Sequence, residues 1–139
     1  MQRFELSDVE ISQIMTKEVI TTHPEDTVEA AVKKMVEHEI ECLPVVSNGQ
    51  ILVGLITFRD VVTKFLYQAS CKKEMTVAQI MSENIATCGP DCTVLDVAKI
   101  MKNKNRRRIP IVNSDSKLIG IVTNSDLALL GWNLKNKIN

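Results

Sequence analysis

The sequence predicts an α/β fold of the α+β type, in which two copies of one unit each combine a small mixed sheet with two helices. Identical residues recur at a fixed offset of 66 positions, among them Met15 with Met81 and Asp60 with Asp126. Each copy also has one stretch with helical spacing of apolar residues and two short apolar runs on either side of a turn. We therefore expect two domains, residues 8–67 and 76–132.

Each copy is expected to open with a short helix followed by a brief extended piece. Residues 7–10 and 76–79 both fit the capping box, in which a Ser or Thr precedes Glu or Gln by three positions. The extended pieces are residues 19–22 and 85–88, and a proline ends each of them two positions later.

An amphipathic helix, two strands and a closing helix complete each copy. Apolar residues at helical spacing predict the first helix over 28–36 in one copy and 94–101 in the other. The strand pairs that follow carry turn residues between them and lead into the closing helix; they are residues 43–46 with 51–57, and 109–112 with 118–123.

Composition and charge exclude several classes of protein. The 139 residues are 45% hydrophobic, which is too much for a disordered chain, and 17 basic residues balance 17 acidic ones. A net charge of zero argues against a nucleic-acid partner. The longest apolar stretch, residues 51–56, is too short to cross a membrane, and the first residues lack the apolar core of a secretory signal. We therefore expect a cytoplasmic protein without a membrane partner.

The four cysteines, Cys42, Cys71, Cys88 and Cys92, are expected to be reduced thiols because the cytoplasm disfavours disulfides. Cys88 and Cys92 stand four positions apart, but no second Cys/His pair at ligand spacing accompanies them. We predict no metal site.

Both copies close with the same pattern, a glycine, two apolar residues, threonine, two variable residues and aspartate, over residues 54–60 and 120–126. A strand there runs into a helix, and the threonine hydroxyl with the first free N–H groups forms a site for an anion. The aspartate can accept hydrogen bonds from a vicinal diol such as a ribose. The same spacing also fits a capping box that only stabilises the helix, and spacing alone favours that interpretation.

These closures, together with the strands at 43–46 and 109–112, resemble the CBS domain, which is named after cystathionine β-synthase. A tandem pair of CBS domains is called a Bateman module, and the resemblance covers residues 8–131. It implies two small sheets packed with pseudo-two-fold symmetry, two clefts between them and a homodimer. It also implies regulatory binding of an adenosine-containing ligand such as AMP, ADP, ATP or S-adenosylmethionine.

The resemblance further implies which residues line the two clefts. Each cleft takes the threonine and aspartate of one copy and strand residues of the other. The main cleft would contain Thr57, Arg59, Asp60, Thr87, Cys88, Arg107, Arg108, Ile109 and Pro110. The second, weaker cleft would contain Thr21, Thr22, Leu43, Pro44, Thr123, Ser125 and Asp126.

Charge distinguishes the two predicted clefts. Arg59 and the run ending at Arg108 suit phosphate, whereas Glu41 and Ser125 stand at the corresponding positions of the second cleft. We therefore expect nucleotide binding at the Asp60 cleft and a weaker or uncharged ligand, or none, at the Asp126 cleft. The arginine run also lies at a helix C-terminus, where solvated cations complement the helix dipole, so both interpretations stay open.

The expected function is a stand-alone regulatory module that senses an adenosyl ligand and signals through an effector protein in trans. No nucleophile–base pair or phosphate-binding glycine loop is visible, so we expect neither catalysis nor a cofactor. The alternative is a constitutive dimerisation scaffold whose clefts no longer bind a ligand.

Overall fold

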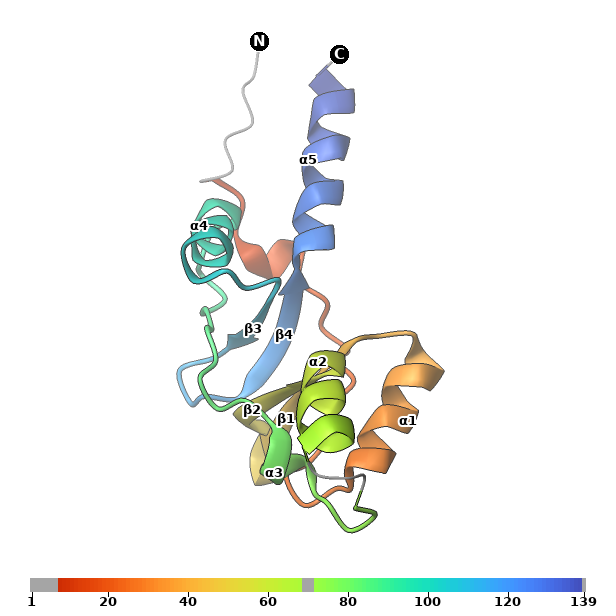
Figure 1. Ribbon diagram of the computed structural model, residues 1–139. Helices are drawn as coiled ribbons and strands as arrows, with labels where there is room; N and C mark the ends of the chain where they lie inside the picture. The colour runs from red at the N-terminus through yellow and green to blue at the C-terminus, as the bar shows by residue number, and fades with distance from the viewer. Residues whose placement is uncertain (1–7, 69–71, 139) are drawn as a thin grey trace. The chain divides into compact units, whose positions relative to one another are not determined.

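The computed structural model describes residues 8–68 and 72–138, and it resolves into two compact units (Figure 1). The central unit is Ile20–Ile85, and the split unit combines Met1–Val19 with Ala86–Asn139. These units cut across the two sequence repeats, because each takes its opening segment from the other repeat.

The central unit is built on a hairpin of β1 (Cys42–Ser47) and β2 (Ile51–Thr57), joined by the short helical turn η3 (Asn48–Gln50). The hairpin is widened on both sides. Thr22 forms a parallel bridge to Val45, and Ser82 forms an antiparallel bridge to Leu55. The predicted mixed sheet is therefore confirmed, although the outer pieces are single bridges rather than full strands.

Three helical segments cover this sheet. They are α1 (Val28–His38), α2 (Phe58–Asp60), which continues in π-helical turns as η4 (Val61–Gln68), and α3 (Val77–Ile80). The apolar stripe predicted on the first of them is buried through Val28, Ala31 and Met35. These residues of α1 form one hydrophobic core together with buried residues of β1, β2, η4 and α3.

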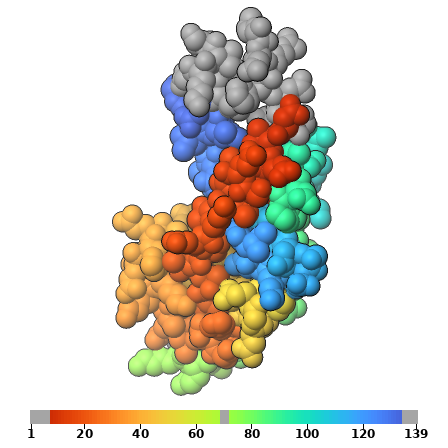
Figure 2. All heavy atoms as spheres, turned by 180° about the vertical axis from the view of Figure 1, so that it is seen from behind, coloured from red at the N-terminus to blue at the C-terminus, as the bar shows by residue number. Residues whose placement is uncertain are grey.

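The split unit repeats this arrangement with β3 (Arg108–Val112) and β4 (Leu118–Thr123) as its hairpin. Its helices are the single turn η2 (Ile11–Gln13), α4 (Val94–Lys104) and α5 (Asn124–Ile138). Bridges join Thr16 to Ile121 and Cys88 to Ile111, and a second core of its own includes Ile11. Figure 2 shows the N-terminal segment, in red, lying along the blue residues of the same unit.

Gly54 and Gly120 lie where these bridged segments pass closest to the hairpins. A Cβ on Gly54 would stand 2.6 Å from the Sδ atom of Met81, and one on Gly120 would stand 2.5 Å from that of Met15. Both distances are too short for real atoms. The glycines of the closing pattern therefore admit a neighbouring segment of the same unit.

The two expected opening helices differ in outcome. The Thr76 capping box is present, with the Thr76 N–H donating to Gln79 Oε1 at 2.8 Å. The helix expected from residues 7–10 is wrong, because Glu10 has extended backbone and precedes the single turn η2. Glu10 instead bridges to Thr93, and the Ile11 N–H donates to the Cys92 carbonyl. Ser7 lies outside the described residues.

The expectation of four reduced thiols is also wrong, since Cys88 and Cys92 form a disulfide. The two residues enclose a tight turn, which brings their Cα atoms to 6.2 Å. Cys42 is a buried free thiol, and Cys71 lies outside the described residues.

Among the residues that the structure describes, no three His, Cys, Asp or Glu side chains gather into a group that would hold a metal ion. Within the same residues, no helix has the length and apolar character to span a membrane.

Candidate ligand-binding site

The junction of β2 and α2 carries a complete capping box. Asp60 Oδ2 accepts hydrogen bonds from the Thr57 N–H at 2.9 Å and from the Thr57 hydroxyl at 3.1 Å. In return, the Asp60 N–H donates to Thr57 Oγ1 at 3.2 Å. These bonds fix the first turn of the helix, so the capping interpretation describes these two residues correctly. Capping uses only one oxygen of the carboxylate.

The second oxygen of Asp60 faces a cation. Lys64 Nζ lies 3.2 Å from Asp60 Oδ1 and donates to the Ile80 carbonyl at 3.1 Å. The Asp60 side chain is only 13% exposed. The carboxylate therefore already carries a partner that any ribose hydroxyl would have to displace or share.

The corresponding junction of β4 and α5 has the same cap but a different neighbour. Asp126 Oδ2 accepts from the Thr123 N–H at 2.9 Å, and the Asp126 N–H donates to Thr123 Oγ1 at 3.2 Å. Leu130 occupies the position that Lys64 has in the central unit. Among the described residues, no cation pairs with Asp126.

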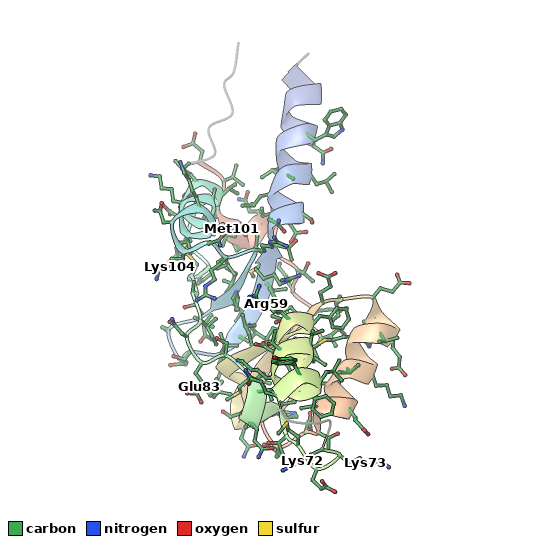
Figure 3. The ribbon with its side chains drawn as sticks, in the orientation of Figure 1. Arg59, Lys72, Lys73, Glu83, Met101 and Lys104 are labelled. Carbon is green, nitrogen blue, oxygen red and sulfur yellow. A yellow bond between two sulfur atoms is a disulfide. The ribbon has the colours of Figure 1, made fainter. Side chains whose placement is uncertain are left out.

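The predicted arginines lie in both units. Arg59 projects from the first turn of α2 and is exposed (Figure 3). Arg107 is exposed just before β3, and its carbonyl accepts from the Asn124 N–H at 2.8 Å. Arg108 is half-buried at the start of β3, in register with Thr123. Arg107 and Arg108 thus stand at the start of β3, and Arg59 stands two residues after the closing threonine of β2.

The strand residues predicted for the two clefts are mostly buried. Leu43 and Ile109 are fully buried in the two cores, and Pro44 and Pro110 are buried beside them. The Thr22 N–H donates to the Pro44 carbonyl at 3.0 Å, as the Cys88 N–H does to that of Pro110 at 3.2 Å. Such residues can present their backbone to a ligand, whereas the side chains of Leu43 and Ile109 cannot reach one.

The three threonines predicted ahead of these strands differ in exposure. Thr87 is exposed, Thr21 is half-buried and Thr22 is fully buried. The Thr22 hydroxyl donates to Asp26 Oδ2 at 2.8 Å. Its side chain is therefore committed to the turn and is not available to a ligand.

Asp26 was not predicted, and its surroundings favour the charged form. Burial raises the pKa of this carboxyl, but hydrogen bonds from the His23 N–H and the Thr22 hydroxyl outweigh it. Lys34, whose Nζ lies 4.0 Å from Asp26 Oδ2, lowers the pKa further. The net result is a pKa below the ordinary value of 3.8.

The comparison with known families agrees with this geometry. The model of the CBS domain matches residues 11–67 and again residues 77–131. The chain belongs to the CBS domain family. Its tandem CBS domains match, copy for copy, the repeat in the sequence.

Individual relatives align with most of this chain. An uncharacterised protein of Methanopyrus kandleri is 35% identical over 122 residues, which are 88% of this chain and 62% of that protein. The inosine-5′-monophosphate dehydrogenase of Korarchaeum cryptofilum is 40% identical over 111 residues, 80% of this chain and 22% of the enzyme. This chain therefore spans less than two thirds of either relative.

Among solved structures, the CBS domain pair of protein MJ0100 is similar over 90% of this chain and 97% of its own length. The TM-score is 0.81 and the sequence identity is 32%. That pair was solved in complex with 5′-methylthioadenosine and S-adenosylmethionine.

Lys64, like Asp26, was not predicted from the sequence. A signal for it exists, because a lysine four positions after an aspartate in a helix is placed to form an ion pair. Its absence from the second CBS domain, where Leu130 stands, makes the two closing motifs chemically different.

Proposed function

We propose that this CBS pair is a regulatory module that binds an adenosine-containing ligand and performs no catalysis. The observation that carries the proposal is the likeness to the MJ0100 pair, whose ligands both contain 5′-thioadenosine. The twin Thr-x-x-Asp closures supply, in each CBS domain, a carboxylate at a strand–helix junction that can accept hydrogen bonds from a ribose.

In this proposal each of two sites draws on both CBS domains. The main site takes Thr57, Arg59 and Asp60 from one domain and the segment at Thr87 and Cys88, with Arg107 to Pro110, from the other. Asp60 binds the ribose, the arginines bind phosphate, and the backbone of Ile109 and Pro110 contacts the adenine. The second site takes Thr123, Ser125 and Asp126 with Thr21, Thr22, Leu43 and Pro44, among which Thr22 and Leu43 act through their backbone.

The charges of the two sites support different ligands. Arg59 and Arg108 favour a phosphorylated adenosine such as AMP, ADP or ATP at the main site. Glu41 near the second site disfavours phosphate and suits a neutral thioadenosine or the sulfonium of S-adenosylmethionine. The lysine beside Asp60 and its replacement by Leu130 beside Asp126 add to this contrast.

Calorimetry with matched variants tests the proposal. We expect Asp60→Ala and Arg108→Ala each to weaken AMP binding about tenfold or more, since each removes hydrogen bonds to a charged group. Lys104→Ala, an exposed cation at the end of α4, is the control and is expected to leave AMP binding unchanged. Circular dichroism checks that Asp60→Ala, which also loses a helix cap, is folded at the temperature of the titration.

Two outcomes contradict different parts of the proposal. If Asp126→Ala abolishes AMP binding while Asp60→Ala and Arg108→Ala do not affect it, the assignment of the main site is wrong. If AMP, ADP, ATP, 5′-methylthioadenosine and S-adenosylmethionine all fail to bind at millimolar concentration, the ligand-sensing function itself is wrong.

The second candidate function is a dimerisation scaffold, and exposed apolar side chains favour it. Leu66 is 51% exposed and Trp132, its counterpart 66 positions later, is 63% exposed. Val62 and Leu129 add exposed apolar surface on the same two closing helices. We propose that these helices form a homodimer contact, that the module acts on an effector protein, and that it does so in the cytoplasm.

Native mass spectrometry separates the two functions, because it reports subunit number and bound ligand together. A dimer that carries an adenosyl ligand supports the sensor. A dimer that takes up none of the five ligands supports the scaffold. If the protein is a monomer, and Leu66→Glu and Trp132→Glu leave the subunit number unchanged, the proposed contact is wrong.

A further inference from the structure

The disulfide lies in a turn that occurs twice in the molecule. Residues 22–27 of the central unit and 88–93 of the split unit are equivalent at the 66-residue offset, and both contain proline third and threonine last. The turns have the same backbone bond. The Asp26 N–H donates to the His23 carbonyl at 3.1 Å, and the Cys92 N–H donates to the Gly89 carbonyl at 3.2 Å.

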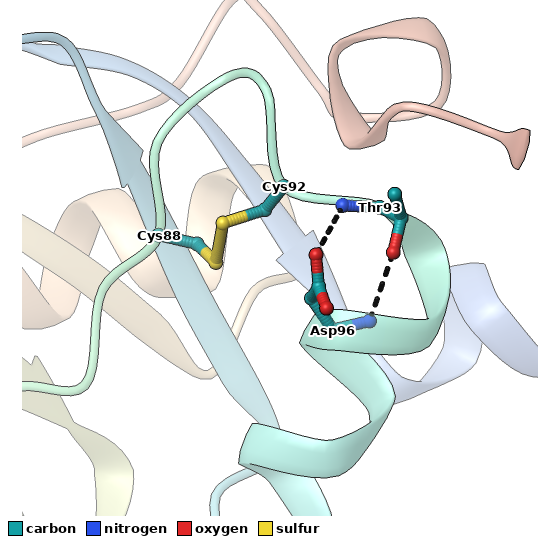
Figure 4. The surroundings of a disulfide bond; sticks show 4 residues. All are labelled: Cys88, Cys92, Thr93 and Asp96. Atoms are coloured by element: carbon teal, nitrogen blue, oxygen red, sulfur yellow. Dashed lines mark hydrogen bonds between the residues drawn. A yellow bond between two sulfur atoms is a disulfide. The ribbon is translucent and has the colours of Figure 1, made fainter. Parts of the chain in front are cut away.

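Only the side-chain closure differs. In the central unit, the hydroxyl of Thr22 donates to Asp26 Oδ2 at 2.8 Å, and His23 Nδ1 lies 2.9 Å from the Val46 carbonyl. In the split unit, cysteines occupy both ends, and the Cys88–Cys92 disulfide replaces the hydrogen bond (Figure 4). A reversible covalent bond therefore does in one CBS domain what a hydrogen bond does in the other.

The bridge connects two structural elements. Cys88 is held on β3 by backbone bonds to Pro110 at 3.2 Å and to Val112 at 2.9 Å. Cys92 directly precedes Thr93, which caps α4 by exchanging bonds with Asp96 (Figure 4). The disulfide thus ties the edge of a sheet to the start of a helix.

The two cysteines differ in exposure. Cys88 is 7% exposed and belongs to the core, whereas Cys92 is partly exposed. A thiolate from outside reaches Cys92 first. In a reducing compartment, where disulfides are usually transient, such a bond opens and closes with the thiol pool.

We propose that Cys88 and Cys92 form a reversible thiol-redox site whose co-reactant is a dithiol, and that reduction loosens the 88–93 turn of the split unit alone. A thiolate of the reductant attacks Cys92 Sγ, the Cys88–Cys92 bond breaks, and Cys88 leaves as a thiolate that takes up a proton. The second thiol of the reductant then attacks the mixed disulfide and releases Cys92 as a thiolate, which is also protonated. Two electrons and two protons pass from the reductant, which leaves as a disulfide.

Peptide mapping and hydrogen exchange test this proposal on the full chain with dithiothreitol as the probe. Trypsin releases residues 74–99, which contain Cys88 and Cys92 and neither of the other cysteines. Without reductant, we expect this peptide to be two hydrogens lighter than the dithiol and to resist alkylation. With dithiothreitol, we expect two alkylations, amide exchange about tenfold faster within residues 88–93, and a Tm lower by about 4–8 °C.

The molecule supplies its own control variant. Cys88→Thr with Cys92→Asp installs the closure that the central unit uses, and we expect its exchange and Tm not to respond to dithiothreitol. The wild-type comparison needs no variant, so it holds even if the double substitution prevents folding. The proposal is overturned if the peptide is never bridged, even in oxidised glutathione, or if reduction leaves exchange within 88–93 unchanged.

A ligand consequence rests on the proposed function, because Thr87 and Cys88 belong to the main site. Reduction is then expected to weaken AMP binding in wild type but not in the Cys88→Thr, Cys92→Asp variant. If neither redox form binds AMP, AMP binding at the main site is contradicted. The hydrogen-exchange comparison with and without dithiothreitol then still tests the redox site. If both forms bind AMP equally, the coupling is overturned.

Discussion

At the scale of single residues, equivalent positions of the two CBS domains have the same backbone role but different chemistry. Asp60 and Asp126 cap their helices in the same way, yet among the described residues a lysine pairs with Asp60 and none with Asp126. Position 22 is a buried threonine and position 88 is a disulfide cysteine. The backbone is preserved because each pair satisfies the same turn or cap, and this leaves the side chains free to diverge.

The Thr22–Asp26 bond gives a prediction about stability and its pH dependence. Thr22→Val keeps the shape of a fully buried side chain but removes a hydrogen bond to a carboxylate, so we expect a loss of about 1 kcal/mol at pH 7. Because the folded pKa of Asp26 lies below 3.8, this carboxylate stabilises the fold above about pH 4. That contribution is lost as the pH falls through the folded pKa, so the two proteins converge in acid.

Urea unfolding at pH 7 and in a series down to pH 2.5 measures both effects. Thr21→Val is the matched control, since no side-chain hydrogen bond of Thr21 occurs among the described residues, and it is expected to change stability by less. A constant difference between Thr22→Val and wild type across the whole pH range would show that Asp26 is not the partner that matters.

At the scale of elements, strong local patterns predicted structure well and tertiary pairing overrode weaker ones. The apolar stripes of α1 and α4 and all four hairpin strands were predicted within a few residues, because burial of one face sets their periodicity. The opening segment failed. Residues 7–10 do fit the capping-box pattern. However, residue 10 pairs with residue 93 and residue 11 with residue 92, and this pairing holds the backbone extended.

The C-terminal ends of α1 and α4 give the second prediction. Glu39 ends α1 with φ of 54°, and Asn105 ends α4 with φ of 52°. Left-handed backbone is costly for glutamate, less so for asparagine, and free for glycine. We expect Glu39→Gly to stabilise the protein by about 0.5–1 kcal/mol and Asn105→Gly to give less. Thermal unfolding ranks the two, and a loss of stability in Glu39→Gly contradicts the backbone argument.

At the scale of the whole molecule, the sequence predicted two copies but not which compact unit each segment of a copy joins. An offset of 66 residues says which positions are equivalent, and it carries no information about which copy an opening segment packs against. The structure pairs Thr16 with Ile121 and Ser82 with Leu55, so each opening segment lies in the unit of the other repeat. The boundaries 8–67 and 76–132 follow the repeat, whereas the compact units do not.

The candidate site was likewise predictable in part, through its local motifs. The motif residues at the strand–helix junctions were found because their spacing in the sequence is local. The hydrogen bonds that the capping interpretation predicted are present. Lys64 and Asp26 were not predicted. Lys64 was missed because residues four positions after each motif aspartate were not compared between the two copies. Asp26 was missed because its partners come from the turn and from α1. The disulfide was missed because the inferred compartment argued against it.

The exchange of opening segments gives the last prediction, which uses a pair of equivalent residues. Ile11 is fully buried in the core of the split unit, and Val77, 66 positions later, is fully buried in that of the central unit. Each substitution to alanine removes buried methyl groups and is expected to cost about 2–4 kcal/mol for Ile11 and somewhat less for Val77. The effects should fall on opposite units. Ile11→Ala is expected to accelerate amide exchange in residues 94–123 and Val77→Ala in residues 28–65, because local opening follows the core that lost the contact. Hydrogen exchange read by mass spectrometry resolves the two regions in one experiment. If packing followed the sequence repeats instead, Ile11→Ala would accelerate exchange in 28–65 and Val77→Ala in 94–123.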